Sequence, residues 1–114
     1  MANQLKNSRL SAFKRQKGRC YYCGFLMWRS NQEQFAKQHG LTAAQARHFQ
    51  CTAEHLVSRQ DGGSNAQYNI VAACITCNQR RHKRNNPPCP ETYLALVSGR
   101  VREGKWFPFR AACA

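Results

Sequence analysis

Four of the seven cysteines stand in two Cys-x-x-Cys pairs, which is a spacing typical of metal ligands. The pairs are Cys20 with Cys23 and Cys74 with Cys77, and residues 24–73 lie between them. Each pair can direct two sulfurs at one point, so together they can complete the tetrahedral four-thiolate shell of a structural zinc ion. Basic residues around the pairs favour the thiolate form. We therefore predict one structural zinc ion that closes a long loop. The alternative is four reduced thiols packed in a core.

Glu54 and His55 form a second group of residues that could take part in chemistry. The chain has five acidic residues, and Glu54 directly precedes a histidine just before a turn at residues 61–64. A carboxylate and an imidazole can both bind divalent cations and transfer protons. Neighbouring side chains of a strand point to opposite faces, so Glu54 and His55 share a site only if the strand ends or twists there.

Around this pair the sequence resembles the HNH endonucleases, whose fold is the ββα-metal, or His-Me, finger. The residues that carry the resemblance are Glu54, His55, Gly62, Gly63, Asn69, Cys74, Cys77 and Asn78. The likeness covers residues 51–84 closely, and an upstream cysteine pair is common in the zinc-bearing branch of that family. The separation of 14 positions between His55 and Asn69 is also typical of it.

The resemblance implies a role for each of these polar residues. His55 would be the general base, Glu54 a ligand of the catalytic metal, and Asn69 the residue that orients the strand and imidazole of His55. Asn78 stands at a position that is often histidine, so this would be an HNN variant with a weaker, oxygen-donating ligand. Oxygen ligands suit Mg2+ or Mn2+ better than zinc.

The activity implied by the resemblance is metal-dependent hydrolysis of DNA phosphodiester bonds to 5′-phosphate and 3′-hydroxyl ends. The alternative is a catalytically inactive, zinc-containing module that binds nucleic acid. Other zinc enzymes are disfavoured because the chain has neither the His-Glu-x-x-His of zinc proteases nor the His-x-Glu of zinc deaminases. A thiol oxidoreductase would use one Cys-x-x-Cys pair and would not need this charge.

His82 follows Asn78 by four residues and shares its face if the segment is helical. His82 could complete the catalytic metal site, which would favour Mn2+ or another transition ion, or it could be one more cation that contacts phosphate. The densest positive cluster surrounds it and is predicted to contact nucleic-acid phosphates. Its members are Arg80, Arg81, Lys83 and Arg84.

The charge of the whole chain also points to a polyanion. Eighteen Lys and Arg residues against five Asp and Glu residues give a net charge of +13 over 114 residues. We expect double-stranded DNA as the partner, with RNA as the alternative, and a monomer or a homodimer. No apolar run reaches the roughly 18 residues of a membrane span, and residues 1–16 lack the apolar segment of a secretory signal. We therefore expect no membrane partner and a cytoplasmic location.

The elements that must position these residues form a small, mostly helical α+β domain, residues 1–114, around a ββα-metal core at about 51–84. The zinc knuckle at 20–23 is expected to be joined to this core through the structural zinc ion. Helices are expected within residues 1–17 and at 31–39, 42–50, 74–84 and 90–102, strands at 51–57 and 68–72, and an aromatic segment that packs on the core at 106–109. The remaining cysteines and histidines are expected to be structural or without a role; they are Cys51, Cys89, Cys113, His39 and His48.

Overall fold

A two-stranded antiparallel hairpin lies at the centre of the fold in the computed structural model, which describes residues 3–110. The strands are β1 (Cys51–His55) and β2 (Ile70–Cys74). Cys51 lies opposite Cys74 at one end of the hairpin, and His55 lies opposite Ile70 at the other. Every residue of β2 is buried, so this strand is central to the core.

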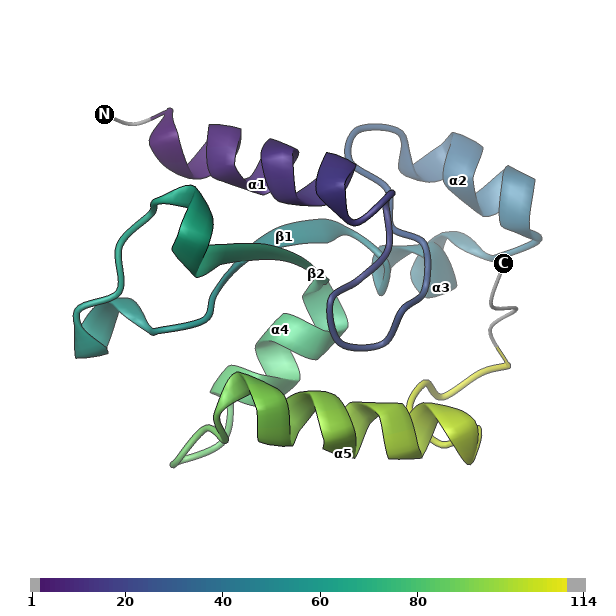
Figure 1. Cartoon of the computed structure of the whole chain (residues 1–114). Helices are drawn as coiled ribbons and strands as arrows, with labels where there is room; N and C mark the ends of the chain where they lie inside the picture. The colour runs from purple at the N-terminus through teal and green to yellow at the C-terminus, as the bar shows by residue number, and fades with distance from the viewer. Residues whose placement is uncertain (1–2, 111–114) are drawn as a thin grey trace.

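Five helices surround the hairpin in the part of the chain that the structure describes. They are α1 (Gln4–Arg15), α2 (Gln32–His39), α3 (Ala43–Arg47), α4 (Ile75–His82) and α5 (Pro90–Arg102). The helix α1 lies along one side of the hairpin, while α4 and α5 lie on the other side (Figure 1). This arrangement confirms the expected α+β class, with β1, β2 and α4 as the ββα unit. No helix in the described residues is both long and apolar enough to span a bilayer.

The helix boundaries follow local signals in the sequence. The Asn31 side chain accepts a hydrogen bond from the Gln34 backbone N–H at 2.9 Å, and α2 ends at Gly40, whose φ is +64°. Thr42 and Gln45 form a reciprocal capping box at the start of α3. The predicted starts of both helices are confirmed.

Several predicted elements are shorter in the structure: the first strand ends at His55 rather than at residue 57, and the helix predicted at 74–84 is Ile75–His82. The third helix was expected to reach residue 50, but it ends at Arg47 because the Trp28 backbone bonds to Phe49 and Cys51 and extends the chain there. The second strand begins at Ile70 rather than at residue 68. A short 3-10 turn, η2 (Gln67–Asn69), precedes it and places Asn69 in the turn.

The core joins the cysteine-rich end of the hairpin to aromatic side chains from both ends of the chain. Tyr22 packs edge-on against Tyr93 with ring centroids 4.8 Å apart, and Phe25 packs edge-on against Phe107 at 5.3 Å. Trp106 and Phe107 are buried, which confirms that the aromatic segment after α5 folds back onto the core.

Candidate active site and metal centres

The four cysteines of the two pairs come together at the junction of β2 and α4. Their Sγ atoms all lie within 4.8 Å of one another, and those of Cys23 and Cys74 are 3.9 Å apart. Zn–S bonds of about 2.3 Å in a tetrahedron would separate the sulfurs by about 3.8 Å. In residues 3–110 this is the only group of three or more His, Cys, Asp or Glu side chains close enough to hold a metal ion. The cluster fits a structural metal such as zinc.

Backbone and indole N–H groups surround the sulfurs of this cluster. The Cys74 N–H donates to the Sγ of Cys20 at 3.2 Å, and the Cys77 N–H donates to the Sγ of Cys74 at 3.4 Å. The indole N–H of Trp106 donates to the Sγ of Cys77 at 3.3 Å. Such donors orient metal-bound thiolates and offset their charge. The sequence predicted that the aromatic segment would pack, but gave no sign of this bond.

The thiols of the cluster are buried as well as crowded. Burial, and after it hydrogen bonding with Cys20, raises the pKa of Cys77 well above its usual value. A second negative charge in such a cluster therefore requires a cation beside it. That requirement agrees with a metal ion and disfavours four free thiolates.

Glu54, in the fourth position of β1, points into the protein and is 1% exposed. Its Oε2 accepts hydrogen bonds from the Tyr22 hydroxyl and from Nη1 of Arg81, each at 2.9 Å. Its Oε1 lies 2.9 Å from Nε2 of His82. Burial and the negative charge of Glu54 raise the pKa of Tyr22, so the phenol keeps its proton and donates it. The carboxylate is thus fully partnered.

His82 and Asn78 lie on α4 next to this carboxylate and β1. The His82 side chain is 36% exposed, so solvent reaches this imidazole, while Glu54 beside it stays buried. The Asn78 amide nitrogen donates to the hydroxyl of Thr52 at 3.0 Å and to the carbonyl oxygen of Ala53 at 3.1 Å. These bonds fix the amide with its nitrogen toward β1, which leaves its oxygen as the atom that a metal could use. Carboxylate, imidazole and amide groups are ligand types that Mg2+, Mn2+ or a similar divalent ion accepts; here Glu54 and His82 are in contact, and Asn78 lies one turn before His82 on α4.

His55 ends β1, and its imidazole contacts a different set of side chains. Nε2 of His55 lies 2.8 Å from Oδ1 of Asn65. The same Nε2 lies 3.4 Å from Nε of Arg59. Arg81 bonds to two consecutive residues of β1. Its Nη1 donates to Oε2 of Glu54 and also to the carbonyl oxygen of His55, at 3.3 Å. The sequence did not identify Asn65 or Arg81 as parts of this site. A polar residue in the loop and an arginine in a basic run carry no signal of such contacts.

Asn69 fixes the loop that leaves His55. Its side chain accepts from the Val57 N–H at 2.8 Å and donates to the Val57 carbonyl at 3.0 Å and to that of Ser64 at 2.8 Å. Gly63 lies directly against these groups, since a Cβ there would be 1.7 Å from the Val57 carbonyl oxygen. The structure therefore brings Asn69 to the chain after His55, where it holds the backbone and not the imidazole itself.

One of the predicted phosphate contacts is corrected by the structure. Arg81 is 5% exposed and makes a buried ion pair with Glu54, while its Nε donates to the carbonyl of Pro88 at 3.0 Å. A buried arginine needs an anionic partner, and this need overrides membership of the basic run. Arg80 lies over the Trp106 ring, 4.7 Å from its centroid. Lys83 and Arg84 are exposed.

The other histidines and cysteines lie away from Glu54. Nδ1 of His48 is 2.6 Å from the Thr76 hydroxyl, and burial, Arg80 and Arg47 lower the pKa of His48. His39 stacks on Phe35 with ring centroids 4.4 Å apart. Cys51 is buried, as predicted, and Cys89 is exposed. Cys113 lies outside the described residues.

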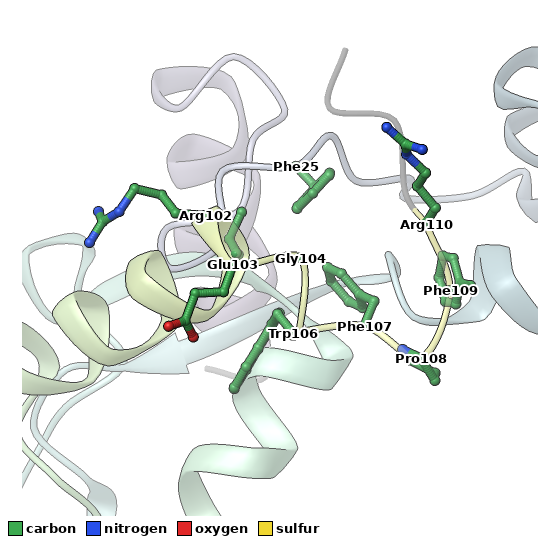
Figure 2. A pocket seen from close by; sticks show the side chains of 10 residues that line it. Phe25, Arg102, Glu103, Gly104, Trp106, Phe107, Pro108, Phe109 and Arg110 are labelled. Atoms are coloured by element: carbon green, nitrogen blue, oxygen red, sulfur yellow. The ribbon is translucent and has the colours of Figure 1, made fainter.

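A cavity of about 670 Å3 lies at the end of α5, beside the turn at Gly104. Figure 2 shows aromatic side chains around it, from Phe25 near the knuckle and from Phe107 and Phe109 in the C-terminal segment. None of the predicted site residues lines this cavity, so the candidate chemistry is confined to the hairpin and α4.

Comparison with known proteins agrees with this placement. Residues 44–84 match the family model described as HNH endonuclease. The matched segment runs from α3 to just beyond α4, and so contains Glu54, His55, Asn69, Asn78 and His82. No curated protein and no solved structure matches the chain.

Proposed function

We propose that this protein is a metal-dependent endonuclease that hydrolyses DNA, because residues 44–84 match the family model described as HNH endonuclease. The products would carry 5′-phosphate and 3′-hydroxyl ends. The observation that supports the proposal most is the 2.9 Å approach of Oε1 of Glu54 to Nε2 of His82. It places an oxygen and a nitrogen donor side by side, and Glu54 directly precedes the proposed base His55 in β1.

In this proposal His55 takes the proton of the attacking water. Imidazole is the side chain that most often serves as a general base at neutral pH. Asn65 orients the ring through its 2.8 Å contact with Nε2. Asn69 holds the backbone on which His55 is carried.

Glu54, Asn78 and His82 would hold the catalytic cation, Mg2+, Mn2+ or a related transition ion. When bound, the cation supplies positive charge for the leaving 3′ oxygen. Attack by water in line with that oxygen leaves the phosphate on the 5′ end. The second part of the proposal is that the structural metal of Cys20, Cys23, Cys74 and Cys77 is zinc, because a closed four-thiolate shell is a zinc site.

The proposed DNA interface consists of the exposed cations beyond α4. Lys83 and Arg84 are free to reach the phosphate backbone, and Arg80 is half-buried beside Trp106. Contacts of this kind give salt-sensitive affinity that does not depend on sequence. Double-stranded DNA is the proposed substrate, and RNA is the alternative to be tested beside it.

The test is cleavage of supercoiled plasmid in Mg2+, in Mn2+ and in EDTA by wild type and by His55→Ala. We expect His55→Ala to keep its fold and zinc content and to lose a factor on the order of 10²–10⁴ in rate. His39→Ala is the matched control, because His39 stacks on Phe35 in α2 and lies outside the proposed site. Full activity of His55→Ala, or cleavage that persists in EDTA, would contradict the proposal.

A further inference from the structure

The two oxygens of the Glu54 carboxylate have different partners. Oε2 accepts from the Tyr22 hydroxyl and from Arg81, and Oε1 faces Nε2 of His82. A carboxylate free to rotate would exchange its two oxygens. Here one oxygen is held by two protein donors, so the other is directed at His82.

Tyr22 comes from the cysteine knuckle, far from Glu54 in sequence. It stands between Cys20 and Cys23, and its N–H donates to the Sγ of Cys20 at 3.4 Å. The preceding N–H, of Tyr21, donates to the carbonyl of Ala72 in β2 at 2.9 Å. The knuckle is thus tied both to the thiol cluster and to the hairpin.

The Tyr22 ring leaves the phenol little freedom. The residue is 2% exposed and packs edge-on between Tyr21 and Tyr93, with ring centroids 5.2 and 4.8 Å away. Ring packing and backbone bonding therefore fix where the hydroxyl lies, and the hydroxyl in turn fixes Glu54.

We propose that Tyr22 is a positioning residue for the catalytic metal: with Arg81 it occupies Oε2 of Glu54, so that Oε1 is presented beside His82 as the metal-binding oxygen. This inference rests on the proposed function, because it concerns the cation that Glu54 would hold. It adds a connection between the two metal centres. The knuckle that binds the structural metal also sets the geometry of the catalytic ligand.

The physical basis is the cost of orienting a ligand at the moment of binding. Partners that hydrogen-bond to a metal ligand fix its orientation in advance, and their loss typically costs about 10- to 100-fold in metal affinity or activity. Arg81 is itself anchored through the carbonyls of Pro88 and His55. Tyr22→Phe removes only the hydroxyl and retains the ring, so Arg81 continues to neutralise Glu54.

The experiment measures Mn2+ affinity by electron paramagnetic resonance on zinc-loaded full-length protein, with zinc content and melting temperature measured on each variant. We expect Tyr22→Phe to bind Mn2+ about tenfold more weakly than wild type. The Mn2+ concentration for half-maximal cleavage should rise by a similar factor, and most of the rate should return at saturating Mn2+. Tyr21→Phe is the matched control, because it makes the same chemical change one residue earlier, at a side chain that is 36% exposed. It should bind Mn2+ as wild type does.

A double-mutant cycle with Glu54→Gln separates positioning from general destabilisation. If Tyr22 acts through Glu54, Tyr22→Phe should have no further effect on Mn2+ affinity once Glu54→Gln is present. Arg81→Lys is the second single variant, because lysine keeps the charge but cannot donate to Glu54, His55 and Pro88 together. It should also weaken Mn2+ binding.

The outcomes distinguish this inference from the function on which it rests. Equal Mn2+ affinity in wild type and folded Tyr22→Phe would overturn the positioning role and leave the nuclease proposal intact. Additive losses in the double variant would overturn it too. If wild type and Glu54→Gln bound Mn2+ equally, or if neither bound it, both the positioning role and the nuclease proposal would be overturned.

Discussion

The two ends of the β1–β2 hairpin carry two kinds of candidate metal centre. At the end where Cys51 lies opposite Cys74, four cysteines form a closed group whose sulfurs are surrounded by N–H donors and aromatic rings. At the end where His55 lies opposite Ile70, the buried carboxylate of Glu54 meets the imidazole of His82, which solvent can reach.

Under the proposed function, this difference separates a centre that would hold the fold from one that would perform the chemistry. A structural zinc site is closed because the protein supplies all four ligands, whereas a catalytic site keeps positions open for water or substrate. The proposed ligands Glu54, Asn78 and His82 would supply three ligands, and the His82 side chain is 36% exposed, so the rest of the shell would come from outside the chain. The same hairpin therefore presents rigidity at one end and access at the other.

The largest expected effect tests the closed end. Cys74→Ser should leave the chain largely unfolded, because a structural zinc contributes on the order of 10 kcal/mol, comparable to the whole stability of a small domain. Metal analysis and circular dichroism should show loss of the zinc and of the cooperative transition. Cys51→Ala is the control, since Cys51 lies opposite Cys74 in the sheet but outside the cluster. A Cys74→Ser protein with one tightly bound, folding-coupled zinc would show that the two ends do not differ in this way.

A smaller effect is expected from the loop at the open end. Asn69→Ala removes the three bonds that hold Val57 and Ser64, so we expect a stability loss of about 2–3 kcal/mol. The cleavage rate should fall while the zinc content stays at the wild-type level. Denaturant unfolding beside the plasmid assay measures both. Asn85→Ala, at an exposed position after α4, should change neither, and loss of zinc in Asn69→Ala would refute the independence of the two ends.

A still smaller effect is expected from the basic run after Asn78, where substitution of an exposed arginine should affect DNA binding and substitution of a buried arginine should affect stability. Arg84→Ala should weaken DNA binding several-fold and reduce the slope of log affinity against log salt by roughly one unit. The same change at Arg81 should lower the melting temperature, because it leaves Glu54 buried without its ion-pair partner. Salt titrations on a short duplex, paired with thermal melts, separate the two. Loss of the salt slope in a fully stable Arg81→Ala would restore Arg81 as a phosphate contact.

Thiol labelling should distinguish the cysteines without changing stability. Burial raises the pKa of Cys51 to about 11, so at pH 8 little thiolate is present, and the rate should increase with pH up to that value. A hydrogen bond with Thr92 lowers the pKa of the exposed Cys89, so Cys89 should react first and reach its limiting rate at lower pH. Peptide mapping after iodoacetamide treatment of the zinc-loaded protein tests this order. Faster labelling of Cys51 than of Cys89 would show that the cysteine end opens readily.

Much of this molecule could be read from local sequence. The Cys-x-x-Cys spacing predicted the four-thiol cluster, and Gly40, Thr42 and Pro90 marked helix boundaries. These features are local because a cap, a turn or a pair of thiols within one knuckle depends on a few neighbouring residues. The polar residues around His55 likewise lie within residues 44–84, which match the HNH endonuclease family model.

Tertiary structure alone decided which partners the Glu54 carboxylate has. Arg81 looked like a member of an exposed basic run, and Tyr22 like one more aromatic residue, until the fold placed both on Oε2 of Glu54. These contacts span 27 and 32 positions along the chain, and they exist because α4 and the knuckle pack against the hairpin. A buried carboxylate must find donors wherever the fold places them, and no local pattern encodes that requirement.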